Sequence, residues 1–374
     1  MFSSIGLEAA GPATLAMPVG AAPTSVQVLG PTALPILHLH LLRRCNLACR
    51  HCYSSSGPSE SEELPLGQAL LAVDLAAAWG YGHVAISGGE PLLYRHLGAV
   101  LDYVHRLGLE ASLVTNGLRA GRPEALELLQ QSRNVTVSLD GAAPRHDGMR
   151  QREGAFEAAL GGLEALSRAG IECGVAYGVT KDNVEDLETV LQIARDAGAT
   201  YAHVHAVEAA GRAATGLNHS LLDRDDVRRV FVLARLLALQ SDRGAVSVHC
   251  DLVHRDRVLE RPALVYASGH GAHPLPHAEL RPSVLVVEPD GAIVPVCYGF
   301  DRAFQIGTIR DVVDGDNRTL QQALRHAMAE LRKVGDSLLH ALQDDPEWTV
   351  LNPSEALGRH ANTMKDVAAR RVQA

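Results

Sequence analysis

The sequence predicts an α/β protein built around a parallel β-sheet, and three observations support this prediction. Between residues 34 and 207, six short strand-like segments alternate with segments of helical spacing. Several helical segments end at a glycine, such as Gly80, Gly108 and Gly170, which is a common residue just past a helix end. Such alternation implies right-handed βαβ units. Periodicity alone fits either an open doubly wound sheet or a partial barrel.

Each strand has its own signal along the chain. The first places apolar residues and histidines on opposite faces, the second is a short apolar run, and the third stops at Asn116-Gly117. The fourth, Asn-Val-Thr-Val-Ser-Leu, is rich in β-branched residues, which suit strands. The six predicted strands are residues 36–42, 83–86, 110–114, 134–139, 171–179 and 201–207.

The helices between the strands show apolar residues at helical spacing. The third of them begins with Pro123, a residue that suits the first turn of a helix. The five predicted helices are residues 66–79, 97–107, 123–131, 155–168 and 184–197.

The pattern changes after Gly211. We expect a long helix at 223–239, a strand at 245–250, a hairpin of 283–287 with 292–296 turning at Asp290-Gly291, and a helix at 319–342. The last stretch is polar, and we expect it to be irregular. The predicted domains are a flexible leader (1–33) with a short strand at 25–29, a core (34–215), a helical linker and loop (216–280), a C-terminal unit (281–345) and a tail (346–374).

Composition excludes several classes of protein. The 374 residues are 47% hydrophobic and 21% charged with a formal net charge of −9, which gives no basic footprint for nucleic acid. No apolar run is long enough to span a bilayer. The N-terminus lacks the basic start and compact apolar stretch of a secretory signal. We therefore expect a cytoplasmic location and no membrane partner.

Three of the six cysteines lie within eight residues. Cys45, Cys49 and Cys52 have the spacing C-x3-C-x2-C, whereas Cys173, Cys250 and Cys297 are scattered. Clustered cysteines in a cytosolic chain indicate metal binding rather than a disulfide framework. Three thiolates on one loop can hold three corners of a cubane iron–sulfur cluster, which leaves one iron open for catalysis.

A structural zinc site with His51 as the fourth ligand is the alternative. Two observations favour the cluster: structural zinc sites usually pair two separated ligand doublets, and His51 is adjacent to Cys52. The zinc interpretation would make this a zinc-stabilised, non-catalytic binding protein.

Polar and glycine-rich segments follow the predicted strands. Cys45 follows the first strand, Gly88 to Pro91 the second, Asn116 the third and Asp140 the fourth. Ligands of parallel α/β folds bind at the carboxyl ends of the strands. These residues are therefore predicted to share one site.

These motifs together resemble the radical S-adenosylmethionine (SAM) superfamily, in its maturase-type branch. Ser87-Gly88-Gly89-Glu90-Pro91 resembles the family's GGEP motif, and Val114 to Gly117 resembles the end of its third strand. The resemblance covers residues 36–213 and is completed by Val137-Ser138-Leu139-Asp140-Gly141, His146-Asp147, Arg150, Gly154, Phe156 and the final Gly211-Arg212-Ala213.

The resemblance implies a partial (β/α)6 TIM-like barrel with a small α+β C-terminal extension. It also implies a [4Fe–4S] cluster on Cys45, Cys49 and Cys52, with SAM on the open iron. SAM cleavage would give a 5′-deoxyadenosyl radical that abstracts hydrogen from a substrate. An electron donor such as flavodoxin or ferredoxin is the expected partner. The candidate cofactor-binding residues are Gly88, Gly89, Glu90, Pro91, Asn116, Ser138, Asp140 and Arg150.

Several of these roles have specific alternatives. The glycines would let backbone approach the ligand closely, and Glu90 would accept from the SAM ammonium. Ser138 and Asp140 would meet ribose hydroxyls or form an ordinary strand-end turn. Arg150 would pair with the SAM carboxylate or be a charge on a helix surface.

The substrate implied by the resemblance is a peptide or peptide-like precursor. Modification of a small molecule, such as a sugar, an amino acid or a tetrapyrrole, is the alternative. A substrate pocket inside the barrel could be lined by His38, His40, Tyr177, His203 and His205, although packed or outward-facing positions for them are slightly favoured.

The segment 286–309 resembles the start of a SPASM domain. Such a domain uses many cysteines for auxiliary clusters, and here only Cys297 fits, with Cys250 far upstream. We therefore expect a degenerate SPASM-like hairpin that packs as structure or binds substrate, and an auxiliary cluster is doubtful. His270, His273 and His277 could be ligands, but we favour a solvated lid. Cys173 is expected in the core.

Overall fold

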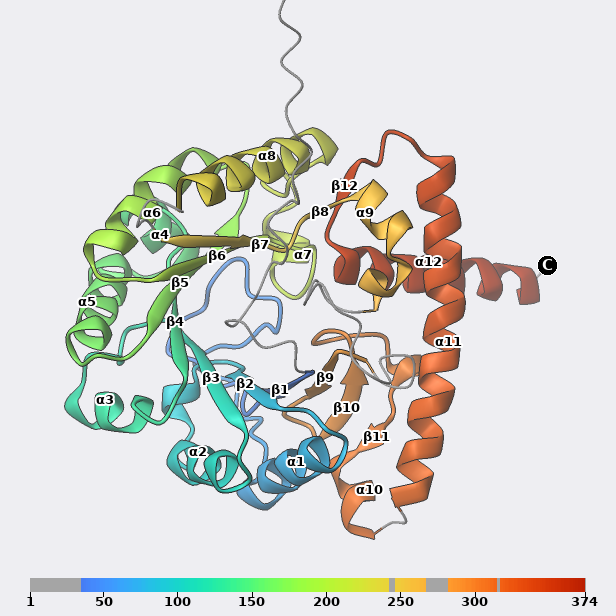
Figure 1. Cartoon of the computed structure of the whole chain (residues 1–374), viewed down its shortest axis with the longest axis horizontal. Helices are drawn as coiled ribbons and strands as arrows, with labels where there is room; N and C mark the ends of the chain where they lie inside the picture. Colours follow the sequence, from blue (N-terminus) through green and yellow to red (C-terminus); the bar gives the residue numbers. More distant parts are fainter. Residues whose placement is uncertain (1–34, 242–245, 267–281, 315–316, 374) are drawn as a thin grey trace, which may run out of the picture.

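The computed structural model describes residues 35–241, 246–266, 282–314 and 317–373. Within this part of the chain, ten strands form one sheet in the order β11-β10-β9-β1-β2-β3-β4-β5-β6-β7. The strands lie in a curved ring with helices on the outside (Figure 1). The predicted fold class, a partial barrel of βα units, is confirmed. The predicted leader strand and the His270, His273 and His277 loop lie outside the described residues.

The first six strands are parallel and sit close to their predicted positions. The strands of the sheet, in chain order, are β1 Ile36–His40, β2 His83–Ser87, β3 Glu110–Thr115, β4 Asn134–Ser138, β5 Cys173–Val179, β6 Tyr201–Ala206, β7 Ser247–Cys250, β9 Val284–Val287, β10 Ala292–Pro295 and β11 Gly307–Thr308.

Helices cover the outer face, where side chains such as Leu37, Leu39 and Val84 are fully buried. The predicted helices are present, with the first turn of the fifth formed by a 3-10 segment. The helices of the barrel half are α1 Leu66–Ala78, α2 Leu97–Arg106, α3 Pro123–Leu129, α4 Ala143–Arg150, α5 Ala155–Arg168, α6 Leu187–Asp196, α7 Ala213–Gly216 and α8 Arg224–Ser241, with 3-10 turns Pro91–Leu93 and Val184–Asp186.

The short helix α4 was not among the elements that periodicity predicted. Its sequence, Ala-Pro-Arg-His-Asp-Gly-Met-Arg, has no apolar stripe, so helical spacing could not reveal it.

The C-terminal residues continue the barrel sheet. β9 pairs parallel with β1, with Ile36 opposite Val284, and the predicted hairpin is formed by β9 and β10. The remaining elements are α9 Arg255–Glu260, α10 Ile309–Asp314, α11 Asn317–Asp344, α12 Pro353–Gln373, the 3-10 turns Pro262–Val265 and Arg302–Phe304, and a two-stranded sheet of β8 Val253–His254 and β12 Val350–Leu351.

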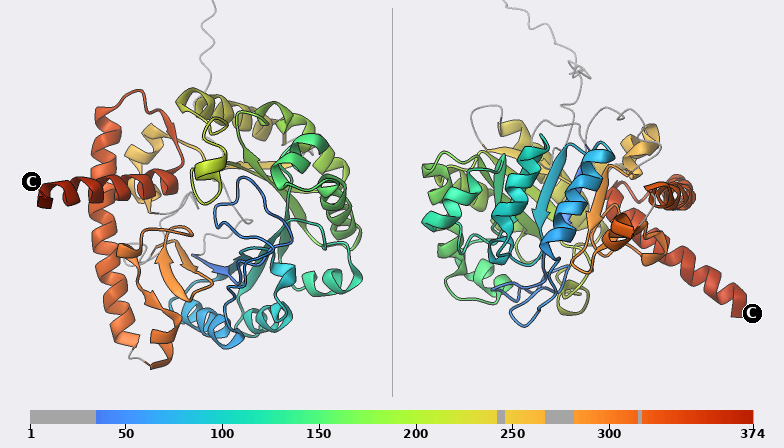
Figure 2. Two further views of the ribbon diagram at one scale, coloured as in Figure 1. Left: turned by 180° about the vertical axis from the view of Figure 1, so that it is seen from behind. Right: turned by 90° about the horizontal axis from the view of Figure 1, so that it is seen from below.

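The expectation of an irregular C-terminal tail was wrong. Residues 353–373 form α12, which packs against α11, and its end projects from the body of the molecule (Figure 2). Its buried anchors include Ala356, Leu357 and Ala361. They are too sparse in a polar segment to give a clear helical pattern. Among the described residues, no helix combines the length and apolar character needed to cross a membrane.

Candidate functional site

The loop that carries Cys45, Cys49 and Cys52, here called the cysteine loop, follows the carboxyl end of β1. Backbone bonds hold its two ends together: the Cys45 N–H donates to the Gly57 carbonyl at 3.0 Å, and the Gly57 N–H donates to the Arg43 carbonyl at 3.1 Å. The Arg50 N–H donates to the carbonyl of Met149 in α4 at 2.9 Å. The loop is therefore fixed to the first strand and to the helix that follows β4.

The three cysteines lie together in this loop. Cys45 and Cys49 are buried and share one small apolar cluster with Leu47, against which Cys52 packs. Burial raises the pKa of Cys45 to about 12 and also raises the pKa of Cys49, where the Arg150 charge opposes it. Binding to a metal requires the thiolate, so cluster binding would have to offset this cost.

Two side chains donate toward the cysteine sulfurs. The Asn116 Nδ2 lies 3.8 Å from Cys45 Sγ, and the Arg150 Nη1 lies 3.7 Å from Cys49 Sγ. Such donors favour a charged sulfur. Among the described residues, no three His, Cys, Asp or Glu side chains form a metal-holding group as they stand. Three cysteine thiols on one loop are nevertheless the kind of donor set that an iron–sulfur cluster takes.

The zinc interpretation finds no support in the position of His51. Its Nε2 faces the Asp140 carboxylate at 3.6 Å. The imidazole is therefore engaged with a neighbouring strand end.

The Gly88-Gly89 segment packs directly on the cysteine loop. A Cβ on Gly88 would lie 2.6 Å from the Leu42 carbonyl oxygen, and one on Gly89 would lie 2.2 Å from that of Arg44. Gly88 also has a φ of +130°, which favours glycine. We expected these glycines to let the backbone approach a ligand closely. In the structure, the atoms that leave no room for a Cβ at Gly88 and Gly89 are backbone atoms of residues 41–44.

Glu90 is fully buried at the end of this segment. Its Oε1 accepts from Thr115 Oγ1 at 2.8 Å and from the Leu92 N–H at 3.1 Å, and its Oε2 accepts from the Asn116 N–H at 2.9 Å. Burial raises the pKa of Glu90. A carboxylate oxygen can accept two bonds, so Oε2 has capacity for one more donor. Its role toward the SAM ammonium stays a prediction. The neighbouring Pro91 is buried and begins the 3-10 turn.

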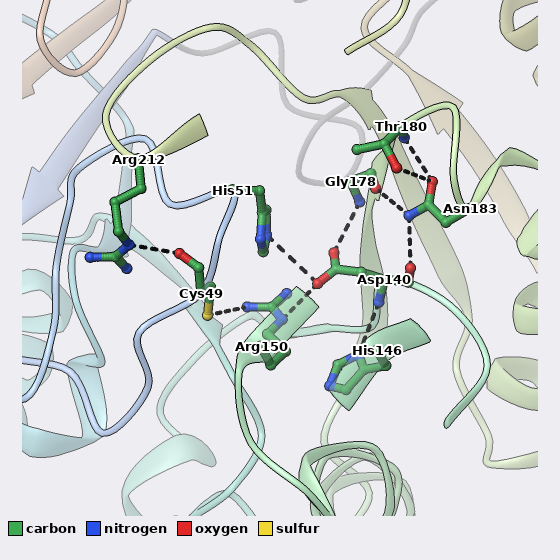
Figure 3. Close-up of polar contacts among 9 residues, drawn as sticks. All are labelled: Cys49, His51, Asp140, His146, Arg150, Gly178, Thr180, Asn183 and Arg212. Carbon is green, nitrogen blue, oxygen red and sulfur yellow. Dashed lines mark hydrogen bonds and ion pairs between the residues drawn. The ribbon is translucent and has the colours of Figure 1, made fainter. Parts of the chain in front are cut away.

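Asp140 and Arg150 form a buried ion pair (Figure 3). The Arg150 Nε lies 2.6 Å from Asp140 Oδ2, with side-chain exposures of 9% and 2%. The Gly178 N–H donates to Asp140 Oδ1 at 3.2 Å. Burial opposes the ionisation of Asp140, but Arg150 and then His51 hold its pKa well below the usual range. Burial also opposes the charge of Arg150, and Asp140 raises its pKa above the usual value.

This pairing decides between the structural alternatives for Arg150. Arg150 is not a helix-surface charge, because it is buried against Asp140 and Cys49. Asp140 pairs with Arg150 and accepts from the Gly178 N–H. Ser138 lies opposite Ala176 on β5. Contacts of Ser138, Asp140 and Arg150 with SAM stay predictions.

Four of the five candidate pocket residues lie on the inner face of the sheet. His38 Nε2 lies 2.7 Å from Ser87 Oγ, and His203 Nε2 lies 2.7 Å from Asp251 Oδ1. Burial, then His38, lowers the pKa of His40. Burial also lowers the pKa of His205, to about 4, with His203 adding to the shift. Burial opposes the charge of His203 too, but Asp251 raises its pKa.

Tyr177 does not belong with them. It pairs with Val204, whereas the flanking Ala176 and Gly178 pair with His203 and His205. Its side chain is therefore on the opposite face, fully buried, and its hydroxyl donates to the Asn183 carbonyl. Tyr177 supports the strand rather than lining the inner face.

Several residues of the site were not among the predicted ones. Asn183 donates to the carbonyls of Asp140 and Gly178 at 2.7 and 2.8 Å, and it accepts from Thr180. Asp251 follows β7 and pairs with His203. Both follow strand ends, so the rule that identified Asn116 could have found them. Tyr53 and Tyr298, which surround His40, have no such signal.

The chain resembles known proteins over this same region. Residues 39–194 match the family model described as the radical SAM superfamily. The Fe-coproporphyrin III synthase of Methanosarcina barkeri is 29% identical over 225 residues, which are 58% of this chain and 56% of that protein. The sporulation killing factor maturation protein SkfB of Bacillus subtilis is 31% identical over 194 residues, 51% of this chain and 47% of that protein. The chain thus spans about half the length of these curated relatives.

A solved structure shares the fold. SuiB of Streptococcus suis, solved with SAM bound, matches with a TM-score of 0.59 at 16% identity, over 78% of this chain and 68% of that chain. The same protein has been solved with its precursor peptide SuiA. At this level of identity the likeness concerns the fold, and it agrees with the partial barrel described above.

Proposed function

Because residues 39–194 match the family model of the radical SAM superfamily, we propose that this chain is a radical SAM enzyme whose Cys45, Cys49 and Cys52 hold a [4Fe–4S] cluster. The observation that carries the proposal is the trio of thiols gathered in one loop at the carboxyl edge of the barrel, within the matched domain. When bound, the cluster and SAM would provide the radical chemistry that abstracts a hydrogen atom from the substrate.

The residues around the loop would bind and orient these groups. Asn116 and Arg150 donate toward two of the three sulfurs. Glu90 Oε2 has an acceptor position left for the SAM ammonium, and Ser138 would meet the ribose. The Gly88 to Pro91 segment would form the wall that holds the methionine end. The buried surroundings of the loop would exclude water.

We propose a peptide or peptide-like precursor as the substrate. A relative that is a maturation protein and a structural neighbour solved with a precursor peptide support this class. His38, His40, His203 and His205 would line the pocket. A small iron–sulfur or flavin protein, such as ferredoxin or flavodoxin, would supply the electron.

A tetrapyrrole is the second candidate substrate. The relative from Methanosarcina barkeri is named for an iron porphyrin product, and this favours a tetrapyrrole over a sugar or an amino acid.

The C-terminal hairpin would act mainly as structure. β9 and β10 extend the barrel sheet beyond β1, and Tyr298 stacks on His40 with ring centroids 4.4 Å apart. We propose that the degenerate SPASM-like region closes this side of the pocket without an auxiliary cluster. The predicted domain boundaries, including the core at 34–215, stay predictions.

Iron content tests the cofactor proposal. Anaerobically reconstituted protein should hold about four irons, the content of one [4Fe–4S] cluster, and cleave SAM to 5′-deoxyadenosine under strong reductant. Cys45→Ala should lose the cluster absorbance and this activity. Cys173→Ala is the matched control, because Cys173 lies in β5 and its thiol contacts the carbonyls of Leu163 and Gly198. Wild-type protein that binds zinc and no iron would reject the proposal.

Anaerobic turnover discriminates the two substrate classes. A short precursor peptide encoded beside the gene and an iron coproporphyrin would be supplied separately, with deuterium at candidate carbon positions. Deuterium in 5′-deoxyadenosine from the peptide alone would support the first class. Transfer from the porphyrin alone would replace it by the second.

A further inference from the structure

Two arginines from separate elements contact Cys49. Arg150, the last residue of α4, directs Nη1 at the Cys49 sulfur at 3.7 Å. Arg212, after β6, donates from Nε to the Cys49 carbonyl at 2.7 Å, and its backbone N–H donates to the Cys52 carbonyl at 3.0 Å. Figure 3 shows both guanidinium groups beside Cys49. One cysteine is therefore held at its sulfur and at its backbone.

The close approach of the second arginine depends on its neighbour. A Cβ on Gly211 would lie 2.3 Å from the Tyr53 carbonyl oxygen and 2.4 Å from that of Cys52. Gly211 also has a φ of +52°, which L side chains rarely adopt. The absence of a side chain at Gly211 thus allows Arg212 to lie directly against the backbone of the cysteine loop.

Asp140 fixes the orientation of the first arginine. Its Oδ2 lies 2.6 Å from Arg150 Nε, and its own position is set by the Gly178 N–H and by Asn183, which binds its carbonyl. A buried ion pair of this kind contributes little net stability. Here its geometry turns a permanent positive charge toward a sulfur.

We propose that Arg150, oriented by Asp140, and Arg212 are positioning residues that retain the cluster at Cys49 and raise its reduction potential. The inference rests on the proposed function, because it requires the cluster. Reduction adds one negative charge to the cluster, and a fixed guanidinium beside a ligand sulfur stabilises that charge. The arginines would therefore ease delivery of the electron that precedes SAM cleavage.

The test measures iron retention and the midpoint potential, by EPR-monitored titration of reconstituted protein without substrate. Arg150→Gln should shift the potential to a more negative value and weaken iron retention by about 10-fold, as loss of an outer-shell partner commonly does. Arg150→Lys keeps the charge and should restore most of the potential. Arg212→Gln should lower iron retention. Arg145→Gln is the matched control, because Arg145 is on the same helix but pairs with the distant Asp186.

Arg150→Gln leaves Asp140 buried without its partner, which destabilises the folded protein. A second variant keeps the test decisive if Arg150→Gln folds poorly. The double variant Arg150→Gln with Asp140→Asn leaves no unpaired charge and should still show a more negative potential than wild type. If every variant that folds and binds iron has the wild-type potential and retention, the inference is overturned. Wild-type protein without an iron–sulfur cluster would instead overturn the proposed function.

Discussion

The two flanks of the cysteine loop are held by different kinds of contact. On the β2–β3 flank, the backbone N–H groups of Gly89 and Glu90 donate to the carbonyls of Leu42 and Arg44. There is no room for a side chain at Gly88 or Gly89. On the β4–α4–β6 flank, charged side chains dominate, with Asp140, Arg150 and Arg212 at Cys49. The first flank holds the loop by backbone contacts, and the second adds charged side chains to the close backbone approach at Gly211.

This difference separates two kinds of vulnerability. The first flank should be sensitive to added volume. The second should in addition be sensitive to the loss of one charge from the Asp140–Arg150 pair. Substitutions on each flank can be compared by their effects on the free energy of unfolding.

The largest effect is expected from Asp140→Asn. The change leaves the Arg150 guanidinium buried without a counter-charge, and breaking a buried pair costs about 3–5 kcal/mol. Chemical denaturation would measure the loss. A change below about 1 kcal/mol would show that the pair is solvated and would end the distinction between the flanks.

Gly89→Ala should be the most damaging change on the other flank. The added methyl would lie 2.2 Å from the Arg44 carbonyl oxygen, and overpacking of this kind costs about 1–3 kcal/mol. Gly161→Ala in α5 is the control, since no heavy atom lies within 4 Å of the position that its methyl group would take, and it should stabilise the protein by about 0.5–1 kcal/mol. Equal effects of the two substitutions would contradict the steric argument.

A pH series sharpens the comparison on the charged flank. Burial, then Arg150, lowers the pKa of His146 from 6.5 to about 4. The unfolded chain therefore binds this proton more readily between these pH values, so stability should fall as the pH drops from 6.5 toward 4. A pKa lowered this far corresponds to roughly 3 kcal/mol. His146→Gln should flatten the pH dependence of the unfolding midpoint, and an unchanged slope would refute this assignment.

The smallest effect is expected from Arg145→Gln. Arg145 pairs with Asp186 at 2.8 Å, but its side chain is 45% exposed, and exposed pairs contribute about 0–1 kcal/mol. Thermal unfolding of Arg145→Gln and of Asp140→Asn would compare an exposed ion pair with a buried one. Each pair includes an arginine of α4. A loss as large as that of Asp140→Asn would show that exposure is the wrong criterion.

The sequence predicted those parts of the site that local pattern controls. The alternation of strands and helices gave the sheet, and residues after strand ends gave Cys45, Asn116 and Asp140. The partner of Arg150 was not predictable, because it depends on how α4 turns back toward β4. The sequence also did not reveal on which face of the sheet Tyr177 lies. β5 is buried along its whole length, and such strands lack the alternation of apolar and polar residues that distinguishes the two faces.

The pairing of β9 with β1 has a consequence for how the chain assembles. β1 is synthesised well before β9, so this edge of β1 is covered only when Val284 to Val287 have left the ribosome. Until then the strand that precedes the cysteine loop presents unpaired backbone groups, which invite pairing between chains. A nascent or truncated chain ending before β9 should therefore be prone to self-association, and its retention by chaperones would be an expected feature of biosynthesis.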